Sequence, residues 1–99
     1  APVVDEEDIV YVEVLRHDLH YHLASSREPL RIRGSLSSAE SELGAGFVRI
    51  SASCLVNVGH VVSVDGPSLG MDDGSTLFFS RARRHDALAE LTRFLGAGA

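Results

Sequence analysis

Apolar and polar residues alternate with a two-residue period over the first third of the chain, and this pattern predicts β-strands. Residues 9–15 are rich in β-branched and aromatic side chains. After an interruption at residues 16–18, the alternation resumes over 19–23 and again over 30–33. Residues 9–34 are therefore expected to form an antiparallel meander.

A short helix and further strands are expected in the middle of the chain. Ser37 and Glu40 fit a capping box at the start of a helix that follows Gly34. Asp73-Gly74 is a residue pair typical of a two-residue hairpin turn. Short apolar runs predict the strands, at residues 47–50, 54–56, 61–64, 69–71 and 77–79.

The last predicted element is an amphipathic helix. Leu88, Leu91 and Leu95 recur at helical spacing. Ser80 is the expected N-cap of this helix and Gly96 its expected end. Together the elements predict a mainly β fold of small antiparallel sheets with one short internal helix and one C-terminal helix.

The chain of 99 residues is expected to hold a single domain. Residues 1–8 contain a proline and an acidic run without periodicity, so they are predicted to be a linker. Residues 9–96 are predicted to be the domain, and residues 97–99 a tail. The acidic run is typical of the end of an interdomain linker, and it favours a fragment of a longer protein over a stand-alone one.

Charge is distributed unevenly along the chain. The formal net charge is −5, and all nine basic residues are arginines. Residues 5–8 carry four of the fourteen acids, whereas most arginines gather within residues 16–33 and 81–84. Such clusters leave a nucleic-acid partner open despite the negative net charge. No apolar run is long enough to span a membrane, so no membrane partner is expected.

The sequence carries no strong catalytic or metal-binding signature. His17, His20 and His22 could ligate zinc, but strand alternation places His20 and His22 on one face and His17 beyond a break. A polar sheet face is the simpler interpretation, so no metal or cofactor is predicted. Cys54 lies in an apolar run and is predicted to be a buried small hydrophobe. No nucleophile elbow or phosphate-binding glycine pattern occurs, so no enzyme is predicted, and a histidine-based metal hydrolase is the remaining enzymatic alternative.

Three segments between predicted elements carry groups suited to a ligand. His17, flanked by Arg16, stands in the loop between the first two strands, where an imidazole can reach a phosphate or a base edge. Residues 51–53 offer hydroxyls and backbone amides between two strands. Three arginines within residues 81–84 stand at the expected start of the last helix, where the helix dipole disfavours cations. A nearby phosphate backbone would explain that placement.

Several of these motifs, in the same order, resemble LytTR DNA-binding domains. Residues 46–57, Gly-Phe-Val-Arg-Ile-Ser-Ala-Ser-Cys-Leu-Val-Asn, resemble the signature segment of the family. Residues 9–17 resemble its opening strand and loop histidine, and residues 33–36 the segment before its small helix. Residues 73–81 resemble its closing hairpin, which runs into a serine-arginine pair. The resemblance covers residues 9–95.

The resemblance implies an elongated, all-antiparallel fold and a role in bacterial transcription regulation in the cytoplasm. Most family members carry this domain behind an N-terminal receiver domain. They bind direct repeats in double-stranded promoter DNA as homodimers, by inserting loops into successive major grooves. The implied DNA-contact residues are Arg16 and His17 in the first loop, Ser51, Ala52 and Ser53 in the second, and Arg81 and Arg83 in the third, where the register leaves open which arginine reads a base.

The second loop departs from the family pattern. The family commonly has histidine, asparagine, arginine or lysine where this chain has Ser51 and Ala52. Ala52 offers only its backbone amide and a methyl group that can touch thymine. Together with the net charge, this predicts weak and strongly salt-dependent binding. The alternative function is a protein- or ligand-binding module on the same scaffold that has lost its DNA contacts.

Overall fold

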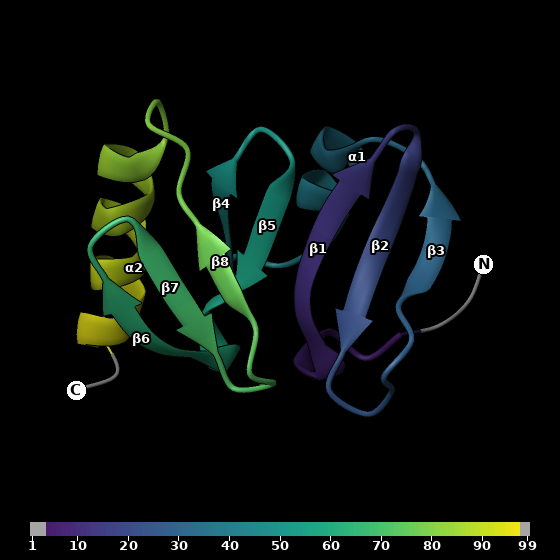
Figure 1. Ribbon diagram of the computed structural model, residues 1–99, viewed down its shortest axis with the longest axis horizontal. Helices are drawn as coiled ribbons and strands as arrows, with labels where there is room; N and C mark the ends of the chain where they lie inside the picture. The colour runs from purple at the N-terminus through teal and green to yellow at the C-terminus, as the bar shows by residue number, and fades with distance from the viewer. Residues whose placement is uncertain (1–3, 98–99) are drawn as a thin grey trace.

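The computed structural model describes residues 4–97, which form two antiparallel sheets and two α-helices (Figure 1). In chain order the elements are a 3₁₀ turn η1 (Glu6–Asp8), β1 (Ile9–Leu15), β2 (Asp18–Leu23), β3 (Leu30–Arg33), α1 (Leu36–Glu42), β4 (Phe47–Ser51), β5 (Cys54–Asn57), a 3₁₀ turn η2 (Val58–His60), β6 (Val61–Asp65), β7 (Ser68–Met71), β8 (Thr76–Phe78) and α2 (Arg84–Ala97). The predicted mainly β fold with an internal and a C-terminal helix is confirmed. Residues 1–3 of the predicted linker and residues 98–99 of the predicted tail lie outside the described residues.

The larger sheet has the strand order β3-β2-β1-β5-β4, with antiparallel pairing throughout. The predicted meander is confirmed as β1, β2 and β3. The smaller sheet has the order β6-β7-β8, and its β7–β8 hairpin turns around Asp73-Gly74. The connection is longer than the predicted two-residue turn, because β7 ends at Met71 and β8 begins at Thr76. β1 is the central strand of the larger sheet and pairs with β2 on one side and β5 on the other.

The first half of strand β1, Ile9–Val12, is apolar and buried on both faces, whereas Glu13 and the residues after it are partly or fully exposed. The register with β2 shifts between Ile9 and Tyr11, so Val10 sits in a bulge. As a result Val10 and Tyr11 belong to one hydrophobic cluster, whereas Ile9 and Val12 belong to the other.

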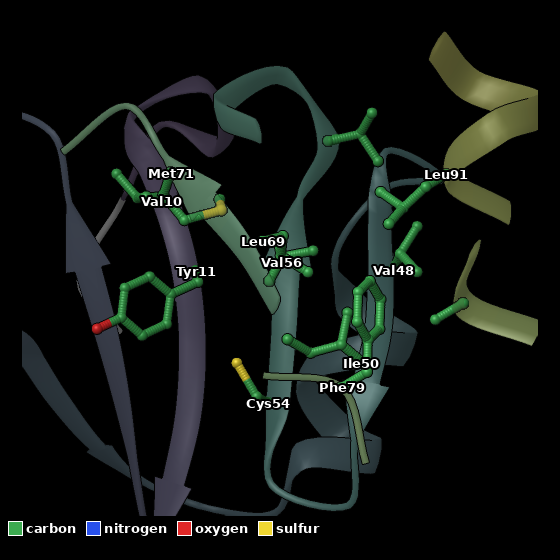
Figure 2. Close-up of a cluster of buried hydrophobic side chains, with 12 residues drawn as sticks. Val10, Tyr11, Val48, Ile50, Cys54, Val56, Leu69, Met71, Phe79 and Leu91 are labelled. Atoms are coloured by element: carbon green, nitrogen blue, oxygen red, sulfur yellow. The ribbon is translucent and has the colours of Figure 1, made fainter. Parts of the chain in front are cut away.

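Each face of the larger sheet is covered by one hydrophobic cluster. On one face, α1 contributes Leu36 and Ala39. On the other face, the smaller sheet and α2 pack against β4 and β5. Figure 2 shows three members of this second cluster close together: Val48 of β4, Phe79, which directly follows β8, and Leu91 of α2. Both faces of the larger sheet are therefore covered, and the loops that connect its strands lie at the ends of the strands.

The start of α1 differs from the prediction. Ser35 is the N-cap, and its Oγ accepts a hydrogen bond from the backbone N–H of Ser38 at 3.2 Å. The predicted capping box of Ser37 and Glu40 is wrong. Leu36 is buried in the core and occupies the first helical position, so the cap falls on the residue before it.

Helix α2 also begins later than predicted. It starts at Arg84, and Ser80 instead closes a turn before the helix by accepting at its Oγ from the N–H of Arg83 at 3.3 Å. The helix extends through Ala97, beyond the predicted end at Gly96. Arg81 and Arg83 therefore precede the helix.

The acidic run that was predicted to belong to a linker folds back onto the sheet. Asn57 donates its side-chain amide to the carbonyls of Glu6 at 3.1 Å and Ile9 at 2.8 Å. The carboxylate of Asp8 accepts from the backbone N–H and the hydroxyl of Ser25. Residues 5–8 thus pack against the same structure as the strands that follow them.

Candidate nucleic-acid interface

The three segments singled out in the sequence lie along one edge of the molecule (Figure 1). They are the β1–β2 turn, the β4–β5 turn and the segment between β8 and α2. Topology explains the convergence, because β1 and β4 both pair antiparallel with β5 and must therefore end at the same edge. In Figure 1, β8 points to that edge as well. The edge runs along the longest dimension of the molecule, which measures 34 Å.

The β1–β2 turn presents Arg16 and His17 to solvent, and both side chains are exposed. The backbone carbonyl of His17 accepts from the N–H of Gly34 at 3.0 Å, which ties the turn to the end of β3. Arg16 has a φ of +62°, in the left-handed region that disfavours residues with a Cβ. A long cationic side chain is thus held in a conformation that suits glycine, an arrangement typical of functional loops.

The β4–β5 turn presents Ala52 and Ser53, which are exposed, while Ser51 is half-buried. The carbonyl of Ser53 accepts from the N–H of Val14 on β1 at 2.9 Å. The hydroxyl of Ser51 accepts from the N–H of Ser53 at 3.2 Å. The turn is therefore short, internally bonded and fixed to the neighbouring strand.

The segment between β8 and α2 presents Arg81 and Arg83, both exposed. Its anchor is Ser80, whose N–H donates to the carbonyl of Ile50 on β4 at 2.9 Å. Because Ile50 precedes the β4–β5 turn by one residue, the anchor places the arginine segment beside that turn. Arg84 follows as the first residue of α2.

Basic and acidic residues are distributed unevenly between the two edges of the molecule, although Arg27 lies in the β2–β3 loop at the edge opposite the three loops. The edge that holds the three loops carries the exposed Arg16, Arg81 and Arg83, and β3 ends at the same edge with the exposed Arg33. The opposite end holds the start of β1, which the acidic turn η1 precedes, and the β7–β8 turn with its aspartates (Figure 1). A negatively charged domain therefore offers a locally basic edge, which can steer a polyanion to one side.

A comparison with protein families settles the relationship. The family model for the LytTR DNA-binding domain matches residues 2–92. This chain belongs to the LytTR DNA-binding domain family. Among solved structures, the LytTR DNA-binding domain of a methyl-accepting/DNA response regulator from Bacillus cereus has the same fold, with a TM-score of 0.73 and 21% sequence identity. That match covers 94% of this chain and 85% of the other. No match was found among curated proteins.

His22 and Cys54 of this LytTR domain are held in structural contacts. His22 stacks on Tyr11 with ring centroids 4.1 Å apart, and its Nε2 lies 2.9 Å from Oε1 of Glu13. Within residues 4–97, no group of three or more histidine, cysteine and acidic side chains could hold a metal. Burial, with the nearby charge of Glu13, raises the pKa of Cys54 to about 12, so the thiol stays protonated, and its prediction as a buried hydrophobe is confirmed. No helix in this part of the chain is long and apolar enough to cross a membrane.

The sequence interpretation missed Arg49 as a member of this edge. Arg49 lies in the segment that resembles the LytTR signature, but it was not among the predicted contacts. In β4 it alternates with the buried Val48 and Ile50, so it faces α1. The sequence did offer one signal, which is an arginine between two apolar residues directly before the β4–β5 turn. The partners of Arg49 become visible only in the folded structure.

Proposed function

We propose that this LytTR domain is the DNA-reading output module of a bacterial transcriptional response regulator. In this proposal it acts in the cytoplasm, behind an N-terminal receiver domain, and binds direct repeats in promoter DNA as a homodimer. The observation that carries the proposal is the gathering of three exposed loops along one edge, two of which carry arginines and the third of which carries serines. Membership of a DNA-binding family supports duplex DNA as the ligand.

The length of the edge suits the spacing of major grooves on a duplex. The molecule measures 34 Å along this edge. One turn of B-DNA advances about 34–36 Å, which is the length of the whole molecule, and the three loops lie within that length; their entry into successive major grooves is part of the proposal and rests on the family resemblance. In the proposal the loops themselves enter the grooves.

Each loop has a proposed chemical role. The imidazole of His17 donates to or accepts from a purine edge, and one of Arg81 and Arg83 binds guanine O6 and N7. Arg16 and the hydroxyls and amides of the serine-bearing β4–β5 turn hold phosphates. Ala52, at the tip of that turn, contributes its N–H or its methyl group.

The first test is a selection of bound duplexes from random DNA at low salt. The wild-type domain is expected to enrich a motif with direct-repeat character. His17→Ala should lose the preference at one part of the motif and bind the selected duplex roughly 5- to 150-fold more weakly, the cost of one base contact. Two copies of the domain per repeat pair, measured by sedimentation, would support the homodimer.

The same selection assigns the arginines. Arg81→Ala or Arg83→Ala should relax the motif at one position if that arginine reads a base, and should weaken all duplexes equally if it binds phosphate. Arg27→Ala is the matched control, because Arg27 is an exposed arginine in the β2–β3 loop at the opposite end. Failure of the wild-type domain to enrich any duplex would refute the proposal and point to a partner other than DNA.

A further inference from the structure

Each of the three guanidinium nitrogens of Arg49 donates one hydrogen bond. Nε donates to the carbonyl of Ser51 at 3.3 Å, and Nη2 donates to the carbonyl of Ala52 at 3.0 Å. Nη1 donates to Oε1 of Glu40 on α1 at 3.5 Å. The Arg49 side chain is only 21% exposed. Three of its five N–H donors are therefore engaged with the β4–β5 turn and with α1.

These contacts satisfy the hydrogen-bond acceptors of the turn. Arg49 holds the carbonyls of Ser51 and Ala52, and Val14 holds that of Ser53. Carbonyl oxygens that pointed outward would repel phosphate oxygens and base acceptors. Because the protein itself binds them, the turn has a defined shape before any ligand arrives, and the cost of ordering it on binding is reduced.

The ion pair with Glu40 connects two of the contact loops. Helix α1 packs on the sheet through Leu36 and Ala39, so Glu40 stands on a fixed element. Just before α1, the N–H of Gly34 donates to the carbonyl of His17 in the β1–β2 turn. The helix thus borders the first contact loop at its start and holds the second through Arg49. This connection adds to the backbone hydrogen bond between Val14 on β1 and the carbonyl of Ser53, which also links the two loops.

We propose that Arg49, held by Glu40, is a positioning residue for DNA recognition, which shapes the β4–β5 turn and does not itself bind phosphate. The inference rests on the proposed function. Lysine cannot replace arginine in this role, because a single ammonium group lacks the planar fork that reaches two carbonyls and a carboxylate together.

The test compares Arg49→Lys and Arg49→Gln on the duplex that the wild-type domain selects. Both variants should bind about 10-fold more weakly, the scale of one displaced base contact, with an unchanged slope of log affinity against log salt. The loss of preference should fall on one contiguous block of the motif, different from the block that His17→Ala affects. Arg93→Gln, which removes the same charge from an exposed arginine on α2, should leave the motif unchanged.

A phosphate contact would give the opposite pattern. Arg49→Lys would then bind nearly as well as the wild-type domain, and Arg49→Gln would reduce the salt slope by about 0.9. Either result overturns the positioning role. Circular dichroism and thermal unfolding of each variant identify any loss of binding that reflects unfolding.

A measurement without DNA separates this inference from the proposed function. In NMR spectra, the amides of residues 51–53 should shift and exchange faster in Arg49→Lys and Arg49→Gln, and to a smaller degree in Glu40→Gln. If the wild-type domain selects a duplex but these amides are unchanged in the variants, the inference alone fails. If the wild-type domain selects no duplex, the proposed function fails, and the role of Arg49 in DNA recognition fails with it.

Discussion

His60 ties the N-terminal turn to the rest of the domain through both nitrogens of its ring. Nδ1 lies 2.9 and 2.8 Å from the two carboxylate oxygens of Asp72, and Nε2 lies 2.6 Å from the carbonyl oxygen of Glu7. A carboxylate and a carbonyl can only accept hydrogen bonds, so both ring nitrogens must carry a proton. The geometry therefore calls for a charged imidazolium.

The electrostatic surroundings of His60 agree with this geometry. Burial by itself lowers the pKa of His60, but the hydrogen bonds to the Glu7 carbonyl and to Asp72 raise it. The negative charges of Asp72 and Asp8 raise it further, and the net result is a pKa above the ordinary value of 6.5. A pKa raised in the folded state stabilises the fold fully at pH values below the unfolded pKa, and this stabilisation is lost as the pH rises through the folded pKa. The domain should therefore lose stability as the pH rises above 6.5 and passes through the folded-state pKa of His60.

The expected size of the effect follows from the number of donors. Deprotonation leaves the ring of His60 with one N–H for two acceptors, so one hydrogen bond to or from a charged group is lost. Such a bond contributes about 1.5–3 kcal/mol. The side chain of His60 is 16% exposed but that of Asp72 is 42% exposed, which weakens the interaction through solvent screening. We expect a loss of about 1–2 kcal/mol in the free energy of unfolding.

The assay is urea unfolding of the wild-type domain and of His60→Gln from about pH 5.5 to about pH 9. Glutamine keeps a donor but does not titrate, so the difference between the two proteins isolates the ionisation of His60. That difference should shrink as the pH rises. Asp72→Asn removes the charged acceptor and should reduce the pH dependence in the same way. An NMR titration of the His60 ring reports its pKa directly.

Two results would refute this reasoning. A difference between wild type and His60→Gln that stays constant across the pH range would show that the protonation of His60 is not coupled to folding. An NMR titration in which His60 deprotonates below pH 6.5 would show that burial outweighs the two hydrogen bonds.

Two further predictions concern strain and packing. Arg16→Gly should raise the free energy of unfolding by about 1 kcal/mol, because it relieves the left-handed φ of +62°, while it weakens duplex binding; chemical denaturation that shows a destabilised variant would contradict this. Leu91→Ala should lower the free energy of unfolding by about 3 kcal/mol, because Leu91 is 1% exposed in the core between α2 and β4. A loss below about 1 kcal/mol in urea unfolding would contradict the packing described for α2.

Local sequence determined the elements of this LytTR domain. Alternation over residues 9–34 predicted the meander, Asp73-Gly74 predicted the hairpin, and the leucine spacing predicted α2. These signals are local, because a strand or helix repeats its own period and a tight turn needs particular residues at particular positions. Element boundaries were less well determined. The cap of α1 fell on Ser35 instead of Ser37, since burial of Leu36 decides where the first turn lies.

The contact edge and its supports were decided by tertiary structure. The sequence indicated three ligand-binding segments, but only the antiparallel pairing of β1 and β4 with β5 brings two of their loops to one edge. Arg49 of β4 forms an ion pair with Glu40 of α1, and the side-chain amide of Asn57, the last residue of β5, donates to the carbonyl of Ile9. A periodic pattern carries no information about such pairs, because the partners lie on different elements and their energy depends on the distance and burial that the fold creates.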